Sequence, residues 1–291
     1  MWIYVYPNNT ETEITNAYIG STSVKRATMR VNGAEKQVRP TWWNMDNRTL
    51  AQTSNSLSWN WWGGVFLNPD GTKIYLTQWG GGFFEWVLST PYNISSLTLT
   101  NTIPVSAIWG WPEDIHFSTD GTKMFTVTET NQVSTVSQFN LSTAWSTSSA
   151  VLDSHKVTWL SGYCRWLYIT PDGETIFVTI RNSTTFYKIP LSTAWDLSTA
   201  WTVTTGTSSI WWLSLRMWNE GKFVAWGDDE NLSTLTYGTL STPYSLATST
   251  VLGNKNVGTA RAWGLRFNNT WTICLIVWGG GSTNYVTKYS L

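Results

Sequence analysis

One short turn motif recurs at intervals of about 50 residues in this chain of 291 residues. It reads Asn-Pro-Asp-Gly-Thr-Lys-Ile-Tyr around Asp70, Ser-Thr-Asp-Gly-Thr-Lys-Met-Phe around Asp120 and Thr-Pro-Asp-Gly-Glu-Thr-Ile-Phe around Asp172. Short apolar and β-branched runs flank each copy, and Asp-Gly between two such runs indicates a β-hairpin. A repeat of this length and content is typical of β-propeller blades, so we expect an all-β fold with one four-stranded sheet per repeat.

A second motif has the same period. Leu-Ser-Thr, a small residue or proline, and an aromatic residue begin at Leu88, Leu141, Leu191 and Leu240. The aromatic position therefore repeats in every unit, as a packing position does and a single binding site does not. We interpret these aromatics as core or inter-blade packing residues: Tyr92, Trp145, Trp195 and Tyr244.

The two ends of the repeat region indicate how the ring closes. Leu291 takes the leucine position of a fifth Leu-Ser-Thr motif whose remainder is missing, so the fifth unit lacks its last strand. Residues 41–53 align with residues 193–205, which carry the last strand of the third unit. Pairing of residues 48–54 with 285–291 would cover an open sheet edge. We therefore predict a five-bladed propeller over residues 43–291, closed by an N-terminal strand.

Residues 1–42 differ in character from the repeats and read as a small β-hairpin module, with one turn at Asn32-Gly33. A module of this size is marginal as an independent domain. We expect it to serve as an attachment module that packs on a partner or on another copy of itself.

Composition excludes several classes of function. The chain has 18 basic and 18 acidic side chains and only 12% charged residues, so no electrostatic footprint indicates nucleic acid. No apolar run is long enough to predict membrane insertion, and the first residues lack the features of a secretory signal. Two cysteines and two histidines without motif spacing predict no metal site, and we expect no cofactor.

Two resemblances add to these expectations. Tyr-Ile-Gly-Ser-Thr-x-Val-Lys from Tyr18 and Gly-x-x-Lys-Gln-Val-Arg-Pro from Gly33 resemble the small N-terminal modules of phage virion structural proteins. The Pro-Asp-Gly-Thr-Lys-Ile-Tyr units are similar to those of WD40-like and YVTN-type propellers. The resemblance implies a non-enzymatic virion or tail-associated protein, on the virion or an extracellular surface, whose partners are a cell-surface glycan or protein and other virion proteins.

Tryptophan is unusually frequent, with 22 residues, and many lie in the connections that lead into each blade's first strand. Indole rings can stack on the apolar faces of sugars, so these loops are the predicted binding surface. The predicted ligand-binding residues are Trp61, Trp111, Arg165, Trp212, Arg261 and Trp263.

Two other functions stay open. A glycoside-active propeller would need two carboxylates near its axis, and Glu113 and Asp114 are the weak candidates. The remaining alternative is a purely structural, decorating virion protein, in which the tryptophans only pack.

A further explanation concerns the tryptophan excess itself. Trp271 stands where other repeats have the glycine of Asp-Gly, and Trp-Gly-Gly-Gly begins at both Trp79 and Trp278. A bulky side chain at a position that favours glycine breaks a local rule. We therefore also consider that some of these tryptophans come from UGA codons that the organism reads as glycine, and UGG codons at positions 79, 166, 271 and 278 would refute this.

Overall fold

The computed structural model describes residues 28–31, 34–37, 49–54, 62–108, 110–181, 183–208, 215–218, 221, 223–227, 234–256, 261–268, 273–279 and 285–290. The chain divides into two compact units, Met1–Asn47 with Leu291, and Arg48–Ser290. Within the described part, no helix is long and apolar enough to cross a membrane.

The first unit contains one described hairpin. Strand β1 (Thr28–Val31) pairs antiparallel with β2 (Ala34–Gln37), and Val31 lies opposite Ala34. This register leaves residues 32 and 33 as the loop, as Asn-Gly predicts for a two-residue hairpin.

The second unit is a propeller whose described strands form five four-stranded antiparallel sheets. Blade 1 consists of β4 (Trp62–Leu67), β5 (Lys73–Gln78), β6 (Gly82–Leu88) and β7 (Leu97–Pro104). Blade 2 consists of β8 (Trp111–Phe117), β9 (Lys123–Thr130), β10 (Val133–Leu141) and β11 (Ala150–Ser161). Blade 3 consists of β12 (Cys164–Ile169), β13 (Thr175–Ile180), β14 (Thr185–Pro190) and β15 (Thr204–Thr207).

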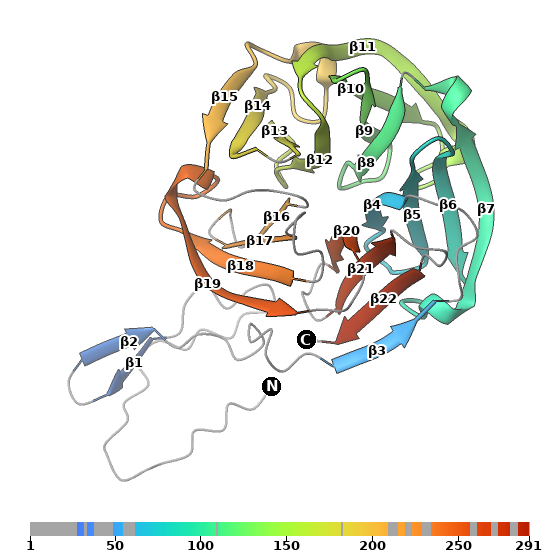
Figure 1. Cartoon of the computed structure of the whole chain (residues 1–291). Helices are drawn as coiled ribbons and strands as arrows, with labels where there is room; N and C mark the ends of the chain where they lie inside the picture. Colours follow the sequence, from blue (N-terminus) through green and yellow to red (C-terminus); the bar gives the residue numbers. More distant parts are fainter. Residues whose placement is uncertain are drawn as a thin grey trace. The chain divides into compact units, whose positions relative to one another are not determined.

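The last two blades complete the ring. Blade 4 consists of β16 (Leu215–Trp218), β17 (Phe223–Gly227), β18 (Thr234–Leu240) and β19 (Ser249–Asn256). Blade 5 consists of β20 (Arg261–Phe267), β21 (Ile273–Gly279), β22 (Tyr285–Ser290) and β3 (Thr49–Thr53). Strands β4, β8, β12, β16 and β20 contact one another in turn around the centre (Figure 1). The predicted all-β, five-bladed propeller is confirmed.

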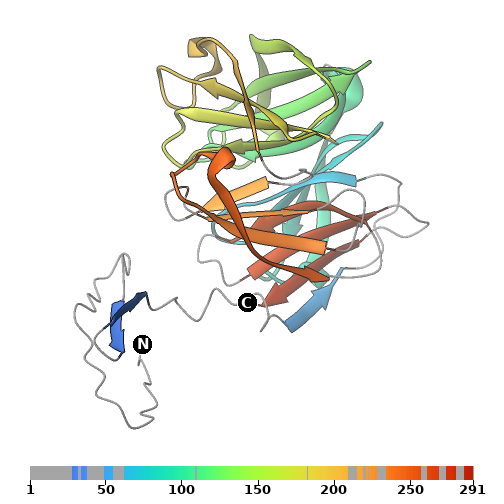
Figure 2. The ribbon, with the colours of Figure 1, turned by 60° about the vertical axis from the view of Figure 1, so that its left-hand side comes forward.

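Blade 5 is closed by a strand from upstream of blade 1, as the sequence predicts. In the antiparallel pairing of β22 with β3, Thr287 lies opposite Thr53 and Ser290 opposite Thr49. The backbone N–H of Ser54 donates to the carbonyl of Val286 at 2.8 Å and continues the pairing. Figures 1 and 2 both show β3, in blue, beside β22, in red.

Each repeated aromatic residue packs on the turn glycine of its own blade. The amide of Trp145 donates to the carbonyl of Gly121 at 2.9 Å, and a Cβ added at Gly121 would lie 2.2 Å from the Trp145 ring. The carbonyl of Trp145 also accepts hydrogen bonds from Lys73 and Tyr75 of blade 1. The position therefore joins its own hairpin to the preceding blade.

Short one-turn 3-10 helices follow the third strand of blades 1 to 4 and carry a second link between blades. They are η3 (Ile94–Ser96), η5 (Thr147–Ser149), η6 (Leu197–Thr199) and η7 (Leu246–Thr248). The N–H of Thr147 donates to Glu85 at 2.7 Å, and that of Leu197 donates to Gln138 at 2.8 Å. Apolar clusters fill the spaces between neighbouring blades, so the core is distributed around the ring.

Candidate functional site

The innermost strands have two ends, and these ends define the two faces of the propeller. Each strand begins at the connection from the preceding blade and ends just before the turn that contains Gly71, Gly121, Gly173 or Gly221. We call the two faces the connection face and the turn face. The predicted binding surface is on the connection face, whereas the central cavity described below opens among residues of the turn face.

A ring of five side chains surrounds the axis near the turn face. Each lies five positions before the turn glycine of its blade, or before Trp271 in blade 5, so the residues are equivalent by the repeat. They are Phe66, His116, Tyr168, Arg216 and Arg266, from β4, β8, β12, β16 and β20 respectively. The five positions are equivalent in the fold, and the blades differ only in which side chain occupies the position.

The ring side chains contact one another across the blades. The Arg266 guanidinium carbon lies 3.8 Å from the centre of the Phe66 ring, a cation–π distance. The Phe66 and His116 ring centres are 5.2 Å apart, and those of His116 and Tyr168 are 6.2 Å apart. Arg266 Nη1 lies 3.5 Å from His116 Nε2.

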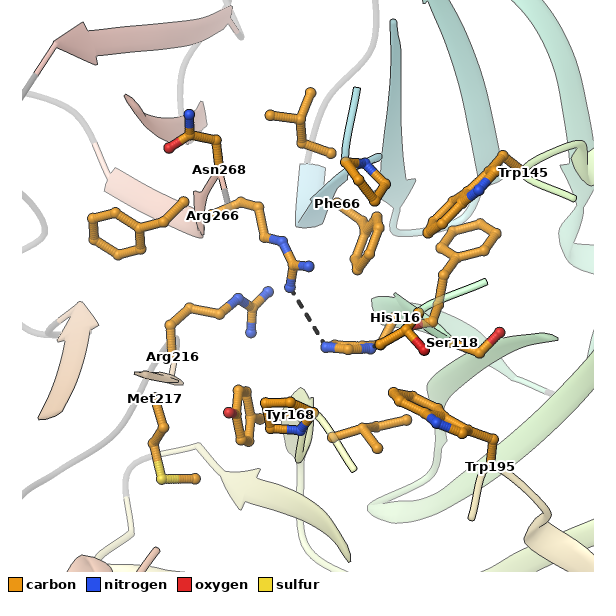
Figure 3. Close-up of a pocket in the computed structure, with 17 residues that line it drawn as sticks. Phe66, His116, Ser118, Trp145, Tyr168, Trp195, Arg216, Met217, Arg266 and Asn268 are labelled. Atoms are coloured by element: carbon orange, nitrogen blue, oxygen red, sulfur yellow. Dashed lines mark hydrogen bonds between the residues drawn. The ribbon is translucent and has the colours of Figure 1, made fainter. Parts of the chain in front are cut away.

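These side chains line a central cavity of about 320 Å³. Figure 3 shows the guanidinium groups of Arg216 and Arg266 converging on one side of it and His116 facing them, with Trp145 and Trp195 beyond. The lining residues are Phe66, Leu67, Pro69, His116, Phe117, Ser118, Thr119, Trp145, Tyr168, Ile169, Pro171, Trp195, Arg216, Met217, Arg266, Phe267 and Asn268.

The cavity has an excess of positive charge. Arg216, which is 2% exposed, donates to the Leu167 carbonyl at 3.3 Å, and its Nη2 lies 3.5 Å from Asp114 Oδ2. For Arg266, no carboxylate among the described residues lies within ion-pairing distance. Burial and the nearby Arg216 charge lower the pKa of Arg266 to about 9, so the guanidinium is still charged at pH 7. Among the described residues, Arg216 thus has a carboxylate beside it and Arg266 has none.

His116 is neutral and has a defined tautomer. Burial, together with the Arg266 and Arg216 charges, lowers the pKa of its imidazole well below 6.5. His116 Nδ1 lies 3.0 Å from the Phe117 carbonyl, and because a carbonyl can only accept, Nδ1 carries the proton. Nε2 therefore presents a lone pair on the side of the cavity where Arg266 lies.

Of the predicted ligand-binding residues, the structure describes the side chains of Trp111 and Arg165, and neither of the two lines this cavity. Trp111 begins β8 on the connection face and is 42% exposed, with its ring 4.1 Å from that of Trp79. Trp61 and Trp212 lie outside the described residues. Arg261 and Trp263 belong to β20, and their side chains also lie outside the described part of the chain.

Arg165, the remaining predicted binding residue, pairs with a predicted catalytic residue. Its guanidinium forms a buried ion pair with Glu113, whose carboxyl is 3% exposed. Burial, partly offset by Arg165, raises the pKa of Glu113 to about 7. Asp114 is fully buried, accepts the N–H groups of Ile115 and Leu167, and lies beside Arg216. Burial raises the pKa of Asp114 as well. Both carboxyl groups are thus held by protein partners.

Within the described ranges, no group of three or more histidine, cysteine, aspartate or glutamate side chains is placed to hold a metal ion. Cys164 and Cys274 are both buried, and neither forms a disulfide.

Known proteins resemble this chain in fold only. No family model and no curated protein matches the sequence. A Lactobacillus plantarum protein matches at 15% identity and a TM-score of 0.47, over 74% of this chain and 63% of its own length. Pseudomonas aeruginosa periplasmic gluconolactonase matches at 13% identity and a TM-score of 0.46, over 86% of this chain and 69% of its own length. The propeller domain of Myceliophteria thermophila Swd1 matches at 9% identity and a TM-score of 0.47, over 84% of this chain and 99% of its own length.

These comparisons overturn the main functional prediction. A non-enzymatic, virion-associated propeller that binds host-surface glycan is wrong as the leading interpretation, because solved structures similar to this chain include a gluconolactonase, which is an enzyme. At these identities the likeness shows the propeller fold, and the chemistry must come from the cavity itself.

Sequence reasoning missed the ring of five, although the signal for it was present. Counting five residues back from each turn glycine finds one residue per blade, and two of those five are arginines. The predicted binding surface was instead placed on the connection face, because the tryptophan-rich connections lie there.

Proposed function

We propose that the central cavity binds a small organic anion. The observation that carries this proposal is the placement of Arg216 and Arg266 in one cavity lined otherwise mainly by apolar and aromatic side chains, with Asp114 as the only carboxylate within 4 Å of either among the described residues. Charged hydrogen bonds from a guanidinium to an oxyanion are strong in a partly buried site. An anion would therefore relieve the repulsion that the two guanidinium groups now experience.

Calorimetric titration of the full chain with acetate, benzoate and inorganic phosphate tests this proposal. We expect one site per chain, with an affinity that falls as salt is added, because the attraction is electrostatic. Arg266→Met should weaken binding about tenfold or more, the effect of removing a charge-assisted hydrogen bond. Equal binding by the variant and the wild type, or no binding of any anion by the wild type, would refute the proposal.

A second candidate function, hydrolysis of an anionic ester or lactone, is favoured by the state of His116. Its neutral Nε2 can take a proton from water while the water oxygen bonds to the acyl carbon. The charge that develops on the carbonyl oxygen would lie near the guanidinium groups, and the departing alkoxide would recover the proton as its bond to the acyl carbon breaks. Three of the similar structures also carry the name of a lactonase, but only the cavity supports this activity for this chain.

The variant His116→Gln distinguishes anion binding from hydrolysis. Proton release from anionic lactones should fall about 100-fold or more in His116→Gln, as expected for loss of a general base. Anion binding should persist in the same variant, because the arginines remain. Unchanged hydrolysis in His116→Gln would exclude this residue as the base.

A further inference from the structure

We infer that the preferred anion is an aromatic monocarboxylate, with its carboxylate at the two arginines and its ring among the aromatic side chains. This inference rests on the proposed function and specifies the class of ligand. It follows from four features of the cavity. These are its charged and aromatic sides, the orientation of its aromatic rings, the hydrogen bonds that its polar side chains already make within the protein, and the charge of its arginines.

The cavity is divided by blade. Both cations come from blades 4 and 5, at Arg216 and Arg266, whereas all the aromatic lining except Phe267 of blade 5 comes from blades 1 to 3. In Figure 3 the guanidinium groups lie on one side of the cavity, and Trp145 and Trp195 lie on the other. A ligand that fills the whole cavity must therefore be charged at one end and apolar at the other.

The rings on the apolar side suit a flat body. Phe66 and Trp145 stack at 22° with their centres 6.1 Å apart. His116 and Trp195 stack at the same angle with centres 6.4 Å apart. Near-parallel ring faces favour an aromatic ligand, because offset-stacked rings attract one another beyond the burial of their area.

Three polar groups of the lining are already engaged by neighbouring protein groups. Ser118 Oγ donates to Asp120 at 2.5 Å, and Asn268 Oδ1 accepts the N–H of Ile273 at 3.0 Å. His116 Nδ1 is held by the Phe117 carbonyl. A polyhydroxylated body would find no free partner at these three groups, whereas an apolar body needs none, so an apolar body is favoured on this side.

The charge balance selects a monoanion. Arg216 and Arg266 supply two positive charges, and Asp114 beside Arg216 supplies one negative charge. Arg266 is therefore the guanidinium that has no carboxylate within ion-pairing distance among the described residues. A carboxylate balances the charge of this guanidinium, whereas a phosphate dianion brings one negative charge more than Arg266 balances. The volume of about 320 Å³ is at the small end for ligand sites and limits the body to about one or two rings.

The test is calorimetric titration of the full chain at pH 7 with 2-naphthoate, acetate, 2-naphthyl phosphate and neutral 2-naphthol. We expect 2-naphthoate to bind with one site per chain, about tenfold or more tightly than each of the other three compounds. Arg266→Met and Phe66→Leu should each weaken 2-naphthoate binding, the first by about tenfold or more. Arg266→Lys keeps the charge but loses the paired N–H donors of the guanidinium, so its affinity for 2-naphthoate should lie between those of wild type and Arg266→Met. Lys188→Met, which removes an exposed cation on β14, is the matched control and should leave affinity unchanged.

The outcomes separate this inference from the proposed function. If acetate binds in a way that depends on Arg266 but 2-naphthoate binds no more tightly, the aromatic class is wrong and anion binding stands. Tighter binding of 2-naphthyl phosphate would overturn the choice of a monoanion. If no anion binds in a way that depends on Arg266, or 2-naphthol binds as well as 2-naphthoate, both proposals fail.

Discussion

At the scale of single residues, the most unusual feature is a set of four aromatic residues in the left-handed conformation. Their φ angles are 60° for Tyr92, 62° for Trp145, 61° for Trp195 and 57° for Tyr244. Bulky residues rarely adopt positive φ, so the surrounding contacts must hold them there. Each ring lies against a turn glycine that itself has a φ of 73° to 77°. The glycine is therefore required twice, for its own φ and as the surface on which the ring packs.

Two glycine variants separate these requirements. Gly121 and Gly80 both have positive φ, at 73° and 78°, but a Cβ at Gly121 would lie 2.2 Å from the Trp145 ring and one at Gly80 would meet nothing within 4 Å. We expect Gly80→Ala to lower the free energy of unfolding by about 1 kcal/mol, the cost of φ alone. Gly121→Ala should cost about 3 kcal/mol or more, because the ring must also move. Equal costs in urea unfolding would contradict the packing role.

The fifth turn offers a prediction of opposite sign. Trp271, which lies outside the described residues, aligns by the repeat with the turn glycines of the other blades. We expect Trp271→Gly to raise the free energy of unfolding by about 1 kcal/mol or more, because the repeat predicts a left-handed backbone at this position, where glycine is favoured. Trp201→Gly, at a position that is 66% exposed, is the control and should not stabilise the chain. Destabilisation by Trp271→Gly would show that this turn departs from the repeat.

Glu113 should give stability a specific dependence on pH. Its pKa is raised from 4.5 to about 7, so the folded chain binds this proton more tightly than the unfolded chain does. Its contribution is fully present below pH 4.5 and is lost as the pH rises to 7, by at most about 3 kcal/mol. Between pH 5 and pH 8, wild type should therefore lose stability relative to Glu113→Gln in urea unfolding. Parallel curves for the two proteins would contradict the raised pKa.

At the scale of elements, closure depends on β3. Besides pairing with β22, this strand carries Gln52, whose Oε1 accepts the N–H of Ile94 at 3.1 Å. Glu85 and Gln138 accept the equivalent N–H groups of η5 and η6. A strand from far upstream in the sequence thus makes the same link to the next blade as strands inside continuous blades.

Removal of β3 should weaken the ring. We expect deletion of residues 1–54 to lower the melting temperature by roughly 10 °C or more and to promote association, because β22 becomes an open edge. Deletion of residues 1–46 keeps β3 and serves as the control. A monomeric chain of unchanged melting temperature after the longer deletion would contradict closure by β3.

The strands and turns of the blades were predictable from the sequence because the same motifs occur in several repeats. The Asp-Gly turns, the leucine motif and the missing last strand of blade 5 each specify local structure, and together they determine the number of blades. The pairing of β3 was predictable because residues 41–53 resemble a last strand. By contrast, the motifs do not specify where each strand begins, and β8 extends back from its turn to Trp111.

At the scale of the whole molecule, the site comes from the ring and not from any one repeat. Arg216 and Arg266 are 50 residues apart in sequence, and each is unremarkable within its own strand. Only closure of the five blades places both beside His116, 100 residues or more away. The sequence contains the ring position, but partners such as Asp114 for Arg216 depend on packing across blades 2 and 4. For this reason Asp114 was predicted as a catalytic candidate, whereas the structure shows it as the buried partner of Arg216.

A crystal structure of the chain soaked with 2-naphthoate tests the central claim most directly, namely that the five blades build one anion site at the axis. We expect density for one molecule in the central cavity, with carboxylate oxygens within hydrogen-bonding distance of Arg266 and the ring beside Phe66 or Trp145. Density beside Trp79 and Trp111 on the connection face, with the central cavity holding only water, would contradict it.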